Sequence, residues 1–415
     1  MSRSRPAPAT DTTTHSTTTG STTTHSTTTG LRTRQAWRQD RPFVVLIGLA
    51  ALPFVVAIVA VAISARQWTP AGDQALQLLE INQVGTSRTP LLGAWSRWGW
   101  HHPGPWPFYV LAPFVWIFGA VGALIGTLLV NLTALLIAVA AGRRRGGNSA
   151  AGLVALLGLV IGFAQGPTVL MDLWNPFVGL YPLYALVVVA WSVSDRDWWF
   201  LPAMAALASF TVQAHVGYLP VVATLCLAAL WMAARPGGST PATPEARQNW
   251  REPTLAALVV VVIAWLPALI DEVRSGQGNV SRLASYATSA SDPTLGWTLA
   301  WQVAVHEIAP LGAWITGREF DLFATSSTPV WAILVIFTTA LLGAVAMKTG
   351  AASTARLAVI SLAAAFAAFV ATSRITGQLF DYLLTWWWVV GAAVWLSIAW
   401  SSWTLVAHRV EPSTT

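Results

Sequence analysis

Ten apolar runs, each near the length that crosses a lipid bilayer, constrain this chain more than any other feature of its sequence. A membrane-spanning helix needs about 20 consecutive, mainly apolar residues. Only 10% of the residues are charged, whereas a soluble domain carries roughly 25%. We therefore expect an all-α, polytopic membrane protein with about ten transmembrane helices. The runs are 43–65, 119–141, 150–170, 175–193, 198–214, 217–234, 253–270, 328–347, 354–372 and 383–405.

The distribution of basic residues predicts the orientation of these spans. With the N-terminus in the cytoplasm, 16 of the 23 basic residues fall on the cytoplasmic side, as the positive-inside rule requires. Two further apolar segments, 103–118 and 295–316, would invert the later loops if either one crossed the membrane. We expect both to be helices at the outer interface, although a re-entrant segment would preserve the orientation equally well. Both termini are then cytoplasmic, in a bacterial cell (inner or plasma) membrane.

The chain divides into three parts by composition. Residues 1–42 form a Thr/Ser-rich cytoplasmic tail, expected to be disordered, with a basic juxtamembrane segment. Residues 43–405 form the multi-span domain, with extracytoplasmic loops 66–118 and 271–327, and residues 406–415 form a short cytoplasmic tail. The basic residues lie in short clusters between apolar runs, so the net charge of +6 does not indicate nucleic acid as a partner.

The first outer loop carries two carboxylates that are candidates for chemistry. Asp73 and Glu80 are seven residues apart, so they share one face if this segment is helical. Asp73 is the candidate for catalysis, and Glu80 is a candidate for lining the site. The alternative for Asp73 is a structural role as a helix N-cap.

Cationic and imidazole side chains follow in the same loop. Arg97, His101 and His102 precede the sequence Pro103-Gly104-Pro105, which fixes a bend. Such side chains, held at headgroup depth, could donate hydrogen bonds to a phosphate. The alternative is that the histidines are interfacial residues without a role.

More polar residues occur at the predicted outer ends of other spans. For any one of them, ordinary polarity at the end of a span is a sufficient explanation. Their accumulation on one side favours a shared polar cavity. They are Asp172, Asn175, Gln213, His215, Asp271, Asn279, Tyr286 and Arg374.

These features together resemble the GT-C superfamily of membrane glycosyltransferases. The similarity rests on a first span, an outer loop that opens with an acid, and a His-Pro motif that leads into an aromatic apolar helix. The most similar groups are the dolichyl-phosphate-mannose-protein mannosyltransferase-like and the aminoarabinose-transferase-like bacterial enzymes. Those often carry His-Pro-Pro-Leu where this chain has His102-Pro103-Gly104-Pro105, and an acidic pair where this chain has Asp73-Gln74.

The resemblance implies an inverting glycosyltransferase that moves a sugar from a polyprenyl-monophosphate donor to an extracytoplasmic acceptor. That acceptor would be a cell-envelope glycan, a lipid or a protein. By position, Asp73 matches the family's general base, and Arg97, His101, His102 and Arg374 are candidates for binding the donor phosphate. No cofactor is implied, because the lipid-linked sugar is a substrate. The resemblance leaves open whether a divalent metal is required. The partners are then membrane lipid, donor and acceptor, while protein partners are not indicated.

Three other functions fit the same topology. A lipid-linked saccharide transporter or flippase would place polar residues through the midplane and show internal repeats. An O-antigen-type polymerase or ligase would use a diphosphate-linked donor. A non-catalytic scaffold could keep the fold without activity.

Overall fold

The computed structural model describes residues 26–64, 68–235, 250–275, 278–289, 293–310, 312–318, 320 and 329–410. It divides into two units, residues 1–44 and residues 45–415. In the first unit the described residues belong to helix α1 (Ser26–Ser64). That helix begins inside the second copy of the N-terminal repeat, so it includes residues 26–30. Residues 1–25, where we also expect disorder, lie outside the described residues.

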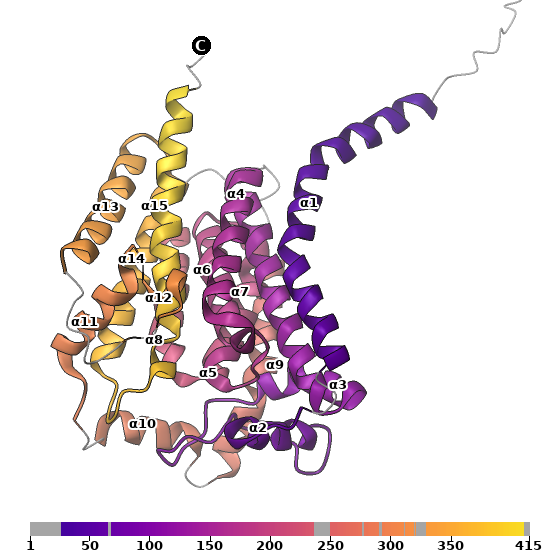
Figure 1. Ribbon diagram of the computed structural model, residues 1–415, viewed down its shortest axis with the longest axis vertical. Helices are drawn as coiled ribbons and strands as arrows, with labels where there is room; N and C mark the ends of the chain where they lie inside the picture. Colours follow the sequence, from indigo (N-terminus) through magenta and orange to yellow (C-terminus); the bar gives the residue numbers. More distant parts are fainter. Residues whose placement is uncertain are drawn as a thin grey trace, which may run out of the picture. The chain divides into compact units, whose positions relative to one another are not determined.

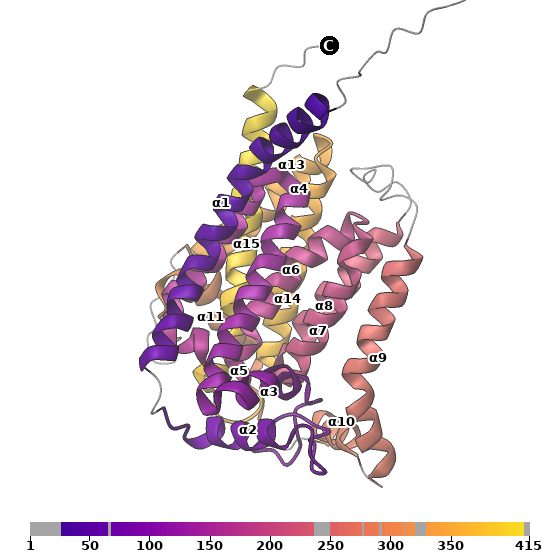
Figure 2. The same cartoon turned by 90° about the vertical axis from the view of Figure 1, so that its right-hand side faces the viewer.

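The described part of the second unit consists of helices and loops without strands (Figures 1 and 2). Among the described residues, eight helical stretches are long and apolar enough to cross a membrane, which confirms an all-α, multi-span architecture. Besides α1 they include α4 (Ala120–Met171), α5 (Asn175–Val178) with α6 (Leu180–Ser194), and α8 (Leu219–Ala234). The remaining four are α9 (Arg251–Arg274), α13 (Pro329–Lys348), α14 (Ala352–Ser373) and α15 (Trp386–Val410). The short helix α7 (Leu201–Ala214) occupies the predicted run 198–214.

Helix α4 accounts for two of the predicted runs, because it turns back on itself. Gly146 and Gly147 interrupt the helical backbone, and Gly147 has φ of 62° and ψ of −153°, a conformation open essentially to glycine alone. The two arms then pack antiparallel. Gly158 lies against Leu135, and the Asn131 side-chain amide donates to the Leu170 carbonyl at 2.7 Å.

Helix α6 forms the centre of the bundle. All of its residues from Leu180 to Ser194 are buried, and it contacts α4, α7, α8, α14 and α15. A helix that is apolar on every side is stable only when other helices enclose it. Small residues let these helices approach closely, and Gly158 in α4 leaves room for the ring of Tyr184.

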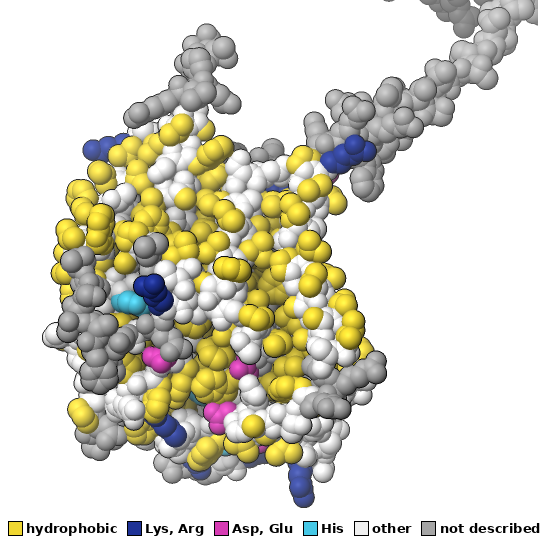
Figure 3. Space-filling model, in the orientation of Figure 1, with side chains coloured by type: hydrophobic (Ala, Val, Ile, Leu, Met, Phe, Trp, Pro, Cys, Tyr) yellow, Lys and Arg dark blue, Asp and Glu magenta, His cyan; other side chains and the backbone are white. Residues whose placement is uncertain are grey.

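Two short helices, α2 (Gly72–Gln83) and α10 (Asn279–Ser289), lie across one end of the long helices, at the bottom of Figure 1. The apolar helix α3 (Trp106–Phe118) packs against α2, α4 and α7. Hydrophobic side chains cover most of the face seen in Figure 3, and the visible acidic side chains lie in its lower half, toward α2 and α10. On this face the acidic side chains are thus confined to one half, whereas Lys or Arg side chains are also visible toward the opposite end.

The segment of α11 (Gly296–Ile308) and α12 (Ala313–Thr316) runs into the bundle from the same end. Leu295 bonds to the Ile375 carbonyl near the start, while the Ile308 carbonyl accepts from the Trp395 indole of α15 at 3.1 Å. Helix α11 packs against α13, α14 and α15, and Glu307 is only 1% exposed. Burial raises the pKa of Glu307, and His306 at 3.1 Å opposes part of that rise.

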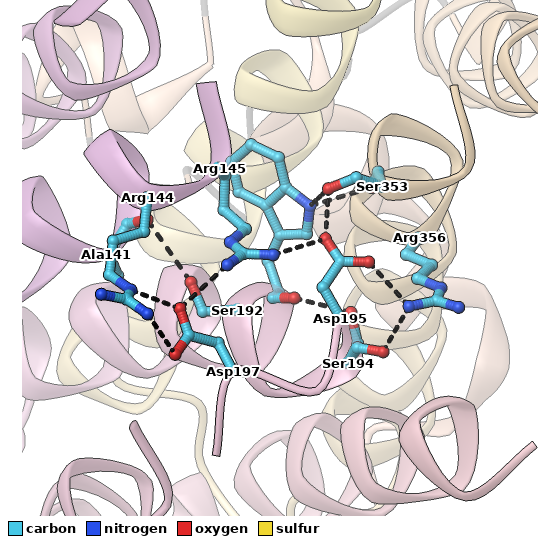
Figure 4. A network of polar contacts seen from close by, with 10 residues as sticks. Ala141, Arg144, Arg145, Ser192, Ser194, Asp195, Asp197, Ser353 and Arg356 are labelled. Atoms are coloured by element: carbon cyan, nitrogen blue, oxygen red, sulfur yellow. Dashed lines mark hydrogen bonds and ion pairs between the residues drawn. The ribbon is translucent and has the colours of Figure 1, made fainter. Parts of the chain in front are cut away.

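The opposite end of the bundle holds a cluster of buried ion pairs (Figure 4). Asp195 accepts from Arg145 at 3.0 Å and from Arg356 at 2.7 Å, and Ser353 donates to the same carboxylate. Asp197 accepts from Arg145 at 2.9 Å and also pairs with Arg144. The cluster joins the turn of α4, the end of α6 and the start of α14.

Arg196 lies between these two aspartates and adds a fourth segment to the cluster. Its φ of 63° is unusual for a residue other than glycine. The guanidinium donates to the carbonyls of Ala233 and Arg235 at 2.9 and 2.6 Å. The end of α8 is thereby tied to the loop after α6.

The length of helix α14 gives the distance between the two ends of the bundle. Arg356 belongs to the ion-pair cluster, and Arg374 follows the last turn of α14 at the end that carries α2 and α10. At 1.5 Å per residue these positions are about 27 Å apart along the axis. That is close to the roughly 30 Å of a bilayer's hydrocarbon core.

Candidate functional site

Asp73 lies in the first turn of α2, where the positive end of the helix dipole favours a carboxylate. It is not the N-cap, because that position is Ala71. Its Oδ2 atom accepts a hydrogen bond from the Trp174 indole at 2.9 Å. The Oδ1 atom accepts none from the described residues, so one carboxylate oxygen is available to a ligand.

Helix α2 is fixed against the start of α5 by two side-chain contacts. The Gln74 amide donates to Asp172 at 2.9 Å, and the Gln77 amide lies 3.3 Å from the Asn175 side chain. Asp172 also accepts from the Trp174 backbone at 2.8 Å, which places the indole beside Asp73. Burial raises the pKa of Asp172, and these two donors offset part of that rise.

The chain between α2 and α3 forms a small hairpin at the end of the bundle that carries α2 and α10. Gly93 donates to the His102 carbonyl at 3.0 Å, and His102 donates to the Ala94 carbonyl at 2.9 Å. Nearer the tip, Ser96 donates to the Trp100 carbonyl at 2.8 Å. We refer to residues 93–102 as the outer hairpin.

Arg97, at the tip of the outer hairpin, contacts the loop after α14. Its guanidinium lies 4.7 Å from the centre of the Phe380 ring and 5.0 Å from that of Trp98. It also donates to the Gln378 carbonyl at 3.4 Å. Two segments almost 300 residues apart therefore meet at Arg97.

His101 does not line the cavity described below, contrary to its expected role as a phosphate ligand. Its Nδ1 atom lies 2.9 Å from the Gly93 carbonyl. Its backbone N–H and C=O both bond to the Asn279 side chain, each at 2.8 Å. Because Asp271 accepts from the Asn279 backbone at 3.3 Å, His101, Asp271 and Asn279 together hold the outer hairpin to the turn between α9 and α10.

Gln213 is also a positioning residue. It is fully buried, donates to the Ala264 carbonyl at 2.9 Å and accepts from the Trp106 backbone at 3.1 Å. It packs so tightly on Gly104 that a Cβ atom there would lie 2.3 Å from its Oε1. The bend predicted at Pro103-Gly104-Pro105 is thus held by one amide.

His102 and His215 lie side by side, with ring centres 4.5 Å apart. Each ring accepts a backbone N–H at Nδ1, from Val216 and from Gly217 respectively, both at 3.1 Å. Burial, and secondarily His215 and His101, hold the pKa of His102 well below its ordinary value. Burial lowers the pKa of His215 to about 4. These shifts favour the neutral form of both rings at pH 7, and in that form His102 offers a phosphate no charge.

These elements enclose a cavity of about 810 Å³, within the usual range for a ligand site. Arg374, after α14, contributes a second guanidinium, and its Cζ lies 5.8 Å from the centre of the Trp297 ring. Eight of the residues expected to form the site line this cavity. They are Asp73, Glu80, Arg97, His102, Asn175, His215, Tyr286 and Arg374. The other five, His101, Asp172, Gln213, Asp271 and Asn279, lie outside the lining and support it.

Aromatic side chains form much of the cavity wall, and the sequence reasoning did not identify them apart from Tyr286. Trp98 and Trp100 both pack against Tyr286, at 5.4 and 5.7 Å between ring centres. Trp174, also in the lining, packs against Tyr382 at 4.9 Å between ring centres. The signal was present in the sequence, because three of its 24 tryptophans, Trp95, Trp98 and Trp100, fall within six consecutive residues of the outer hairpin.

Within the described parts of the chain, no group of three or more His, Cys, Asp or Glu side chains is placed to hold a metal ion. Comparison with known proteins finds no matching family model, no similar curated protein and no similar solved structure.

Proposed function

We propose that this protein is a membrane-embedded glycosyltransferase that uses a polyprenyl-monophosphate sugar as donor. The observation that supports it is the composition of the cavity at the α2 end. A carboxylate with an available oxygen, two guanidinium groups and several aromatic rings line the same 810 Å³ space. Each corresponds to one need of the reaction, namely a base, a phosphate clamp and apolar faces for a sugar ring.

In the proposed step the Asp73 carboxylate takes the proton from an acceptor hydroxyl. The hydroxyl oxygen attacks the anomeric carbon as the bond from that carbon to the phosphate oxygen breaks. The electron pair leaves with the phosphate, and the configuration inverts because attack and departure occur on opposite faces. Arg97 and Arg374 stabilise the charge on the departing phosphate.

The topology is part of this proposal. Counting both arms of α4 and the short α7 gives ten crossings, with both termini in the cytoplasm of a bacterial cell. The cavity then opens outside, and Arg144, Arg145, Arg196 and Arg356 lie inside. Because these arginines bond to Asp195, Asp197 and backbone carbonyls, they serve the fold as well as the orientation.

Reporter fusions test the orientation. We expect alkaline phosphatase to be active when fused after Gly85, in the first outer loop, and inactive when fused after Gly238, between α8 and α9. A cytoplasmic reporter such as green fluorescent protein should give the reverse pattern at the same positions. Active phosphatase after Gly238 would contradict the topology and remove the cavity from the outer face.

Transfer of labelled sugar from a panel of polyprenyl-phosphate hexoses, in membranes that contain the protein, tests the activity. In that assay Arg374→Gln and Arg97→Gln should each raise the KM for the donor by roughly tenfold, as expected for a lost charge-assisted hydrogen bond at a solvated site. Arg88→Gln is the matched control, because Arg88 is exposed in the same outer loop and is not part of the cavity lining. A KM unchanged in both cavity variants would contradict the phosphate clamp.

A further inference from the structure

The two neutral histidines at the cavity wall have a defined tautomer, which the backbone imposes. A backbone N–H can only donate, so the Nδ1 atoms of His102 and His215 that face Val216 and Gly217 must accept. The ring proton of each neutral imidazole is then on Nε2. A proton on either Nδ1 would point at another N–H, so the same contacts oppose a positive charge on either ring.

Both Nε2 atoms are available to a ligand. Neither forms a hydrogen bond with the described residues, and neither is among the described polar atoms sealed from solvent without a partner. Both rings line the 810 Å³ cavity. The cavity wall therefore presents two adjacent N–H donors without net charge.

We propose that His102 and His215 bind the hydroxyl oxygens of the sugar, rather than the phosphate, and so select the glycosylated donor. The inference rests on the proposed function and deepens it. An anionic phosphate is best matched by guanidinium groups, which Arg97 and Arg374 supply in the same cavity. Neutral donors suit neutral hydroxyl oxygens, which need no charge compensation.

The aromatic neighbours support a sugar at this position. Trp100 packs edge-on against His102 at 5.4 Å and also contacts Tyr286 at 5.7 Å, measured between ring centres. Aromatic rings offer apolar faces to the C–H side of a sugar, while the two imidazoles offer donors to its hydroxyl edge. A lipid phosphate without a sugar would use neither feature.

Paired substitutions separate the two nitrogen atoms of each ring. In His102→Asn and His215→Asn, the amide oxygen lies near the former Nδ1 and still accepts the backbone N–H, but the Nε2–H donor is lost. In His102→Gln and His215→Gln, the amide NH₂ lies near the former Nε2 and keeps a donor. Equilibrium binding to the full-length protein in nanodiscs is measured with two lipids, polyprenyl phosphate and its hexose conjugates.

We expect each Asn variant to bind the glycosylated lipid roughly threefold to tenfold more weakly, the effect of one hydrogen bond between neutral groups. Binding of the unglycosylated phosphate should change by less than about twofold. The Gln variants should recover part of the loss. An equal loss for both lipids would assign the histidines to the phosphate and overturn the proposal, and so would no loss for either lipid.

A second measurement does not depend on the lipid. Nitrogen-15 spectra of the imidazoles, assigned with the same variants, should show both rings as neutral Nε2–H tautomers at pH 7. A charged ring or an Nδ1–H tautomer would contradict the inference. If the wild-type protein binds neither lipid, the proposed function fails. Nitrogen-15 spectra recorded with free hexoses then test the histidine pair as a sugar site by itself. Shifted Nε2 signals would then retain the histidine pair as a sugar site, and unshifted signals would reject it.

Discussion

Replacing Asp73 by asparagine is expected to lower the rate of sugar transfer by about 10²–10⁴-fold, the usual effect of losing a general base. The substitution preserves the size of the side chain, and the amide oxygen can still accept the Trp174 indole hydrogen that Asp73 accepts at 2.9 Å. Donor affinity should change little, because the phosphate contacts are assigned to Arg97 and Arg374. The effect should therefore appear in kcat, measured in the labelled-sugar assay at matched protein levels.

Glu80→Gln is the matched control for this prediction. Glu80 lies on the same helix and lines the same cavity as Asp73, and we expect its substitution to reduce kcat by no more than a few-fold. A large loss in Glu80→Gln together with near-normal turnover in Asp73→Asn would transfer the role of base to Glu80. Normal turnover in both variants would contradict a carboxylate base in this cavity. A structural role for Asp73 would be recognised by a lower unfolding temperature of the Asn variant.

The second large effect is expected at the other end of the bundle. Asp195→Asn should lower the free energy of unfolding by about 3 kcal/mol, because removing one member of a buried ion-pair group leaves uncompensated charge. The Asp195 side chain is 2% exposed, and the arginines that pair with it, Arg145 and Arg356, are 10% and 9% exposed. Unfolding of the purified protein in mixed detergent micelles measures the change.

Arg144→Gln provides the comparison within the same cluster. The Arg144 side chain is 49% exposed, and Asp197 keeps Arg145 as a partner at 2.9 Å. Exposed ion pairs contribute roughly 0–1 kcal/mol, so this variant should unfold almost as the wild type does. Equal destabilisation by the two substitutions would show that burial does not determine the strength of this cluster.

The amino-acid sequence alone determined the class of fold. Apolar runs of about 20 residues can satisfy their backbone hydrogen bonds in lipid only as helices or closed barrels, and the composition of these runs specified helices. Sequence spacing also placed Asp73 and Glu80 on one face of a helix, which α2 confirms. The two glycines at positions 146 and 147 lay between two predicted runs, and they are where α4 reverses.

Tertiary structure decided which polar residues form the cavity and which only hold it in place. His101 and His102 are adjacent in sequence, yet Asn279 and Gly93 hold the first outside the lining, while the second faces His215. Such a division depends on partners that are distant in the sequence, above all Asn279 and His215, and no local pattern encodes them. The packing of Trp98 and Trp100 on Tyr286 and the pairing of Arg145 with Asp195 and Asp197 were hidden for the same reason. In the sequence these residues read as interfacial tryptophans and topology-setting arginines, and only packing brings each one to its partner.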